Sequence, residues 1–121
     1  MEDANVFSQH CPTRLVLDRI ADKWALLALR RIERQPVRFN ELRREIEGVS
    51  QKVLSQTLKR LERDGLIIRK VFATVPVTVE YSISPLGQTL TSVASAISIW
   101  AEKNIAEVLE AQRRYDAGQA Q

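Results

Sequence analysis

Apolar residues recur every three or four positions over the first half of the chain. From Leu15 to Ile32 this spacing predicts a helix with one buried face, or two short helices with a break near Asp22. Pro36 then ends the helical pattern. Residues 37–38 suit a short extended piece, and residues 39–46 suit a second helix. The first 46 residues are therefore predicted to be mainly helical.

The strongest helix signal begins at Ser50. Serine is a favourable N-cap, and Gly65 suits the C-terminal cap of the helix that follows. Leu54, Leu58 and Leu61 form its apolar stripe. A tight turn separates this helix from the shorter one before it, and that order is typical of a helix-turn-helix, with residues 50–64 as the DNA-reading helix.

After Gly65 the apolar spacing changes from about four to two. The β-branched run from residue 66 and the alternating run that ends at residue 84 predict a β-hairpin. Ser84 and Pro85 then start a last helix, expected over residues 85–112. We expect an α+β fold that is mainly α: a winged helix-turn-helix domain over residues 13–112, with a flexible segment at 1–12 and a polar tail at 113–121.

Length and charge narrow the function. A chain of 121 residues is predicted to form one domain. The net charge is only +3, but residues 14–70 hold 15 basic and 8 acidic side chains, a net of +7. A basic region of this kind indicates a nucleic acid or an anionic membrane surface as partner. The alternative is an ordinary solvated helical surface.

Several classes of function lack the residues that they need. The amino-terminal residues are polar, and no apolar run approaches the length of a membrane span, so a cytoplasmic protein without membrane contact is expected. The single cysteine cannot form an internal disulfide, and Cys11 with His10 cannot supply a four-ligand zinc site. Phosphate-binding and hydrolase motifs are absent. We expect no cofactor, no metal and no enzymatic activity.

Four segments together resemble the HxlR-type family of bacterial winged helix-turn-helix transcriptional regulators: CPTRLVLDRIADKWALLALRRI, RFNELRREIEGVSQKVLSQTLKRLERDGLIIRK, VPVTVEYSISPLGQTL and SIW. The resemblance covers Cys11 to Trp100. It implies a homodimeric DNA-binding repressor or activator, and in some members a response to oxidants or electrophiles through a cysteine before the first long helix. The chain departs from the family at Ala21-Asp22, where a small or glycine-containing pair is usual. It also departs at Val77-Thr78, where an arginine is frequent, so the hairpin tip is uncharged.

The DNA contacts are expected mainly on the helix after Ser50. Lys52, Ser55 and Gln56 lie opposite or beside its apolar stripe, near its N-terminus, and are expected to reach base edges. The other candidate contacts, mostly to phosphates, are Ser50, Gln51, Lys59 and Arg60 on that helix, Arg38, Asn40, Arg43 and Arg44 near the second helix, and Arg69 and Lys70 at the base of the hairpin. The alternative for each is an ordinary solvated side chain.

The last helix carries an apolar stripe too long for one small domain to cover. A second copy is expected to cover it, packed with the N-terminal helix, which predicts a homodimer and a palindromic operator in double-stranded DNA. The predicted interface residues are Leu90, Val93, Ile97, Trp100, Ile105 and Val108. The alternative is that the stripe folds back onto the first helix of the same chain.

Cys11 is the candidate for a redox sensor. It precedes a helix N-terminus and Arg14, and both favour the reactive thiolate, which combines with quinones, aldehydes or hypochlorite. The alternative is a small apolar residue packed at an interface. Three rival functions remain: the same fold sensing a small apolar ligand at the dimer interface, a winged-helix module that binds protein instead of DNA, and a cysteine-dependent enzyme. The last is weak because no third polar partner is evident.

Overall fold

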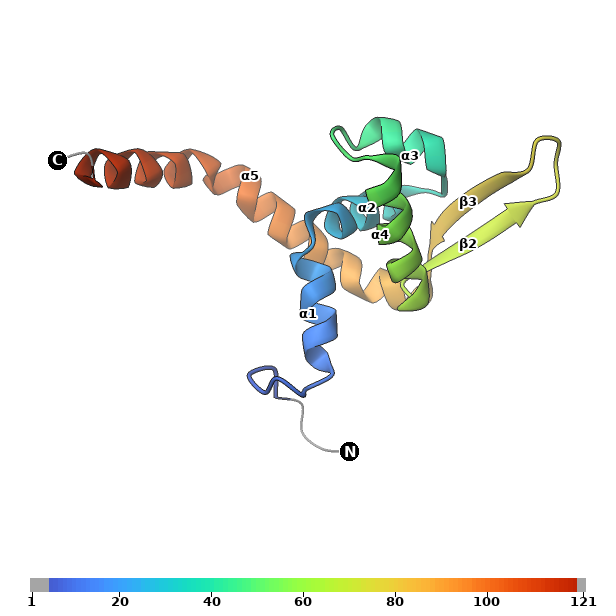
Figure 1. Cartoon of the computed structure of the whole chain (residues 1–121), viewed down its shortest axis with the longest axis horizontal. Helices are drawn as coiled ribbons and strands as arrows, with labels where there is room; N and C mark the ends of the chain where they lie inside the picture. The colour runs from blue at the N-terminus through green and yellow to red at the C-terminus, as the bar shows by residue number, and fades with distance from the viewer. Residues whose placement is uncertain (1–4, 120–121) are drawn as a thin grey trace.

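The computed structural model describes residues 5–119, and its elements follow the order of a winged helix-turn-helix domain (Figure 1). In chain order they are α1 (Thr13–Ala21), α2 (Lys23–Arg34), β1 (Val37–Arg38), α3 (Phe39–Glu45), α4 (Gln51–Arg63), β2 (Ile67–Phe72), β3 (Thr78–Ile83) and α5 (Pro85–Gln119). The hairpin of β2 and β3 projects from one side of the helical body, and the end of α5 projects from the other (Figure 1). The predicted fold class is confirmed.

The conformation of Asp22 shows that the start of the chain forms two helices and not one. Its backbone is extended, and its side chain accepts hydrogen bonds from the backbone N–H of Trp24 at 2.9 Å and of Ala25 at 3.3 Å. The aspartate thus ends α1 and caps α2, because an extended N-cap residue cannot continue a helix. Two helices are therefore present, and α1 holds no buried residue.

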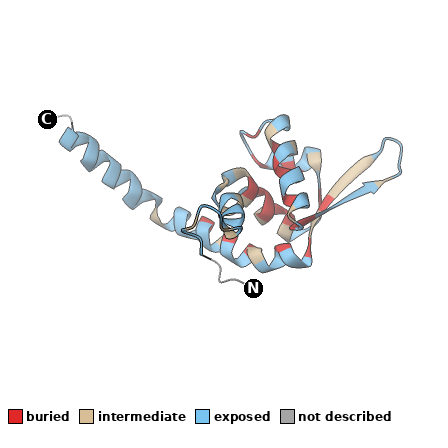
Figure 2. Ribbon diagram, turned by 60° about the horizontal axis from the view of Figure 1, so that its bottom comes forward, coloured by how far each residue is buried: buried red, intermediate tan, exposed pale blue. Residues whose placement is uncertain are grey.

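The core lies where α2 packs against α4, α5 and β3. Leu54, Leu58 and Leu61 of α4 are each at most 1% exposed, so the predicted stripe of this helix is confirmed. They meet Leu29 and Ile32 of α2 in one cluster, seen as red segments at the centre of the domain (Figure 2). Burial of these side chains fixes the orientation of α4 and leaves its opposite face to solvent.

The sheet has one strand more than the predicted hairpin. Its order is β1-β3-β2, with all pairs antiparallel, and Val37 of β1 lies opposite Tyr81 of β3. Both side chains are buried, so β1 closes the sheet over the core. The other end of the hairpin extends beyond the core, and Val75 at its tip is fully exposed.

Helix α5 is longer than predicted, and its buried side was not singled out in the sequence. It continues to Gln119 instead of ending at residue 112, because Arg113, Arg114 and Ala117 are good helix formers and no proline interrupts the segment. The side that faces its own domain is a stripe of small residues, Gly87, Thr91, Ala94 and Ser98. Within residues 5–119, no helix is both long and apolar enough to cross a membrane.

The segment before α1, predicted as flexible over residues 1–12, is described from residue 5 onward, where it forms consecutive turns. Arg14 fastens these turns, donating hydrogen bonds of 2.8 Å to the backbone oxygens of Val6 and Phe7. The first four residues of that prediction lie outside the described part of the chain. Residues 5–12 are therefore held against the start of α1.

Candidate nucleic-acid interface

Helix α4 presents the predicted base-reading residues at its first two turns. The Ser50 hydroxyl accepts a 3.1 Å hydrogen bond from the backbone N–H of Val53, so the predicted N-cap is confirmed. Gln51, Lys52 and Gln56 are exposed, whereas Ser55 is half-buried. The exposed side chains carry the donors and acceptors that read base edges in a major groove.

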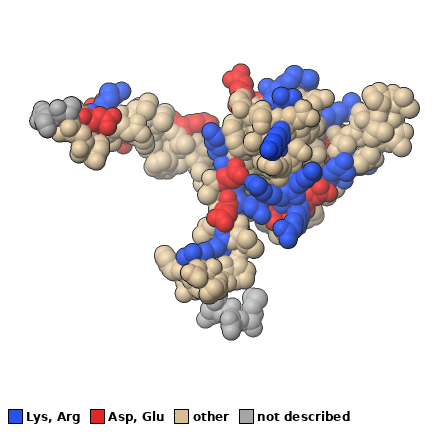
Figure 3. Space-filling view, in the orientation of Figure 1, with Lys and Arg blue, Asp and Glu red and all other residues tan. Residues whose placement is uncertain are grey.

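Positive charge extends along α4 beyond these residues. Lys59 and Arg60 are exposed, and neither has an ion-pair partner among the described residues. In the space-filling view, Lys and Arg side chains gather over the body of the domain, whereas the hairpin tip is neutral (Figure 3). The basic surface therefore belongs to the helical part of the domain and not to the tip of the wing.

A shallow hollow lies beside this surface, between α3 and the turn before α4. It has a volume of about 310 Å³ and is lined by Asn40, Arg43, Arg44 and Val49. Val49 is buried, while the two arginines are exposed. Three predicted contacts thus converge on one depression, which is a suitable seat for a phosphate oxygen.

Two of the candidate contacts on the sheet share an acidic residue as their neighbour across the strands. In the register of the sheet, Arg38 and Lys70 both lie opposite Glu80 of β3, one on each side. Lys70 also lies over the ring of Phe72, at 5.0 Å from its centroid. A carboxylate between two cations lowers the local positive potential. Arg69 is exposed, but the register places it opposite Tyr81, away from this carboxylate.

Arg31 orients α3, and sequence reasoning missed it. This α2 side chain is only 9% exposed and forms an ion pair with Glu45 of α3. Its guanidinium also lies 3.6 Å from the Glu41 carboxylate and donates a 3.1 Å hydrogen bond to the backbone oxygen of Gln35. A buried arginine with this many partners fixes α3 on α2. Nothing in the sequence distinguishes Arg31 from Arg30 and Arg34, which lie on the same helix but are not buried.

The end of α4 is tied to both α1 and α5. Asp64 forms an ion pair with Arg19 of α1. The Ser84 hydroxyl donates a 2.6 Å hydrogen bond to the backbone oxygen of Gly65 and accepts one of 2.9 Å from the N–H of Gly87. Polar contacts therefore link the carboxyl end of α4 to both α1 and α5.

Cys11 is half-exposed at the start of α1, where the sequence predicts it. Its Sγ lies 2.8 Å from the Thr13 hydroxyl. Hydrogen bonds from the Thr13 side chain and then its backbone lower the pKa of the Cys11 thiol, and the charge of Arg14 adds a smaller effect. The predicted direction is right, but the main cause is Thr13, which sequence reasoning did not single out.

Apolar side chains remain exposed along α1 and α5. On α1 they are Leu15, Val16 and Leu17, and on α5 they include Val93, Ile97, Trp100, Ile105 and Val108. Leu90, the remaining predicted interface residue, is partly buried against the core of its own domain. The long stripe does not fold back onto the chain, because the small residues of α5 occupy that position.

Comparisons with known proteins agree with this architecture. A family profile described as HxlR-like helix-turn-helix matches residues 19–109. The helix-turn-helix type transcriptional regulator YtfH of Escherichia coli is 40% identical over 109 residues, 90% of this chain and 86% of that protein. The structure of the regulator ytfH from Salmonella typhimurium superposes with a TM-score of 0.85 at 40% identity, covering 93% of this chain and 99% of the other. The oxidised form of the redox regulator HypR gives a TM-score of 0.72 at 36% identity, covering 78% and 97%.

Proposed function

This chain belongs to the HxlR-like helix-turn-helix family of transcriptional regulators, and from that premise we propose that it binds a palindromic operator as a homodimer and represses transcription. The family is one of regulators, so the chain is not an enzyme. The observation that carries the proposal is the exposed face of α4, capped at Ser50 and held to the core by three buried leucines.

The α4 face supports sequence-specific reading. Lys52 and Gln56 are one helical turn apart and exposed, so both side chains point into the same groove. Glutamine pairs with adenine and lysine with guanine through their major-groove edges. The hollow of Asn40, Arg43 and Arg44 accepts a phosphate next to the groove, which sets the register of α4 on the duplex.

The exposed apolar face of α1 and α5 supports the dimer. Trp100 is 61% exposed and Leu15 is 62% exposed, together with the neighbouring apolar residues of both helices. Exposed apolar surface of this extent is unfavourable in water, and a second copy offers the same surface to cover it. The two-fold axis of such a dimer places the two α4 helices on successive turns of one face of the duplex, roughly 34–36 Å apart or a multiple of that.

Cys11 supplies the proposed input for oxidants or electrophiles such as quinones and aldehydes. Its hydrogen bond to Thr13 and its partial exposure favour a thiolate that reagents reach. The similarity to the redox regulator HypR, whose oxidised and reduced forms are both known, supports this input. Oxidation or alkylation at the start of α1 would alter the packing of α1, which is linked to α4 through Arg19 and Asp64.

A second candidate input is a small apolar ligand, and one cavity favours it. A pocket of about 340 Å³ lies between α1, the end of α4 and the start of α5. Its lining is mainly aliphatic: Pro12, Leu15, Val16, Leu66, Leu86 and Leu90 contribute to it. The same helices form the proposed dimer interface. A ligand in this pocket would therefore act on the contact between α1 and the end of α4, as modification of Cys11 would.

A gel-shift titration with the DNA upstream of the gene tests the proposed function. We expect a discrete complex at moderate salt that unlabelled upstream DNA displaces and unrelated DNA of the same length does not. Absence of any complex over the full range of salt would favour a protein-interaction module instead. The Cys11→Ser variant separates the two inputs: it should bind the operator normally but no longer respond to diamide or a quinone.

A further inference from the structure

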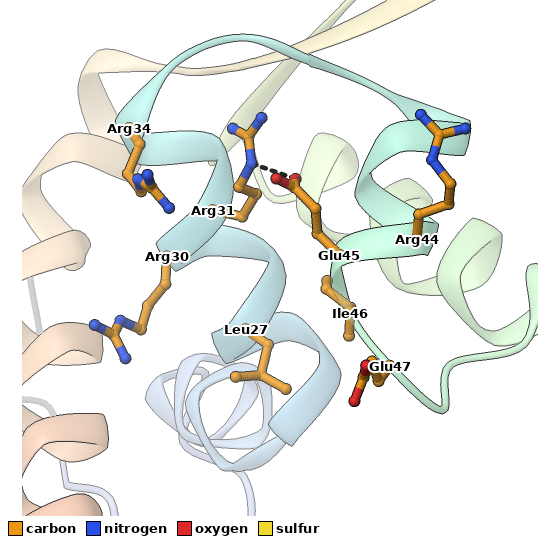
Figure 4. Close-up of a pocket in the computed structure, with 8 residues that line it drawn as sticks. All are labelled: Leu27, Arg30, Arg31, Arg34, Arg44, Glu45, Ile46 and Glu47. Atoms are coloured by element: carbon orange, nitrogen blue, oxygen red, sulfur yellow. Dashed lines mark hydrogen bonds and ion pairs between the residues drawn. The ribbon is translucent and has the colours of Figure 1, made fainter.

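A further cavity is lined by no residue of α4 and not by Cys11. It has a volume of about 740 Å³ and opens between α2 on one side and the end of α3 with the following turn on the other (Figure 4). This volume is within the range of small-molecule sites. Four arginines and two glutamates line it, a net charge of +2, and Leu27 and Ile46 add apolar surface.

The positive charge is concentrated on the α2 wall. Arg30 and Arg34 lie on one side of α2, because residues four apart are neighbours on a helix, whereas Arg31 points toward Glu45 (Figure 4). Arg31 is occupied by Glu45, and Arg30 lies 3.6 Å from Glu102 of α5. Arg34 has no ion-pair or hydrogen-bond partner among the described residues. Like charges at this spacing repel one another, so an anion beside Arg34 and Arg30 would be stabilised.

The end of the cavity away from Arg34 is lined by two apolar side chains and, beyond them, by a glutamate. Leu27 lies one turn before Arg30 on α2, and Ile46 faces it from the turn after α3 (Figure 4). Glu47 follows Ile46 and repels an anion from that end. A bound molecule would therefore place its acidic group toward Arg34 and its apolar part between Leu27 and Ile46.

We propose that this cavity binds a small organic anion, a carboxylate with a short apolar body, held by Arg34 and Arg30 and packed against Leu27 and Ile46. The site is adjacent to the ion pair of Arg31 and Glu45 that fixes α3 on α2. A ligand that contacts both α2 and the end of α3 therefore bridges the two helices that this ion pair holds together. The site is distinct from the exposed face of α4, from Cys11 and from the aliphatic pocket beside α1, and it shares Arg44 with the phosphate hollow on α3.

Methyl NMR on the full-length protein tests the proposal with three probes: hexanoate, its neutral amide, and inorganic phosphate. Hexanoate is expected to shift the methyl signals of Leu27 and Ile46 with saturation at millimolar concentration, and hexanamide to bind at least about tenfold more weakly. Phosphate is expected to leave the methyl signals in place. The variant Arg34→Gln should weaken hexanoate about tenfold, whereas Arg114→Gln, which removes an equal charge from the exposed end of α5, should not.

Four outcomes would overturn the proposal. They are the absence of methyl shifts up to tens of millimolar hexanoate, equal binding of hexanoate and its amide, and equal losses for Arg34→Gln and Arg114→Gln. The fourth is a glutamate-rich peptide that binds this cavity at least tenfold more tightly than hexanoate, since the occupant would then be a protein segment. Because none of these readouts uses DNA, failure here is distinguishable from failure of the proposed function.

Discussion

Gly87 is the position where α5 passes closest to the chain that leaves α4. An added Cβ would lie 2.7 Å from Cδ1 of Ile83 and 3.0 Å from the carbonyl carbon of Leu66, and closer still to the Leu66 oxygen, where ordinary contacts begin at 3.4 Å. The start of α5 would have to move away from Leu66 and from Ile83 of β3. That movement strains the 3.2 Å hydrogen bond from Ser84 N–H to the same Leu66 oxygen.

The variant Gly87→Ala is therefore expected to be strongly destabilised. Overpacking typically costs about 1–3 kcal/mol and a lost buried hydrogen bond about 0.5–1.5 kcal/mol. We expect a loss of roughly 2–4 kcal/mol in the free energy of unfolding, measured by urea denaturation at fixed protein concentration. The matched control is Gly118→Ala on the same helix, where an added Cβ meets nothing within 4 Å, so stability should be unchanged or slightly raised. A Gly87→Ala protein within about 0.5 kcal/mol of the wild type would refute the close packing of α5 on Leu66 and Ile83.

Three further predictions concern the thiol, the dimer and the DNA contacts. Thr13→Val should raise the pKa of Cys11 and move the midpoint of its alkylation rate by iodoacetamide to higher pH, since the thiolate is the nucleophile; an unchanged midpoint would remove Thr13 from the account. Trp100→Glu should convert a dimer to a monomer in analytical ultracentrifugation with its circular dichroism retained, and a persistent dimer would place the interface elsewhere. If six phosphates are neutralised per dimer, the logarithm of operator affinity should fall with the logarithm of salt at a slope of about −5, whereas a slope near zero would contradict phosphate contacts.

The sequence predicts the elements whose signals are local. The N-cap at Ser50, the leucine stripe of α4 and the alternation in β3 each follow from neighbouring residues, and the structure confirms the cap and the stripe. The break at Asp22 was open in the sequence, because a capping aspartate and a surface aspartate inside one helix look alike. The distances from Asp22 to the two backbone N–H groups settle it.

The sequence does not show the interactions that join distant segments. The role of Arg31 depends on Glu45, fourteen positions away, and that of Glu80 on a register that brings Arg38 beside it. The side of α5 that packs on its own domain was not singled out for a related reason. Its close approach to the domain requires small residues, which carry no strong signal in the sequence. The large apolar residues of α5 were expected to stay exposed on one chain, and they do; their cover by a second copy remains a prediction.

The most direct test of the account compares operator affinity with non-specific affinity for the double variant Lys52→Ala with Gln56→Ala. Each bidentate base contact is worth about 1–3 kcal/mol of discrimination, so the ratio of the two affinities should fall at least about thirtyfold at fixed salt. The control Arg114→Ala, on the end of α5, should leave the ratio unchanged. Equal losses of operator and non-specific affinity in the double variant would show that α4 does not read the bases through these two residues.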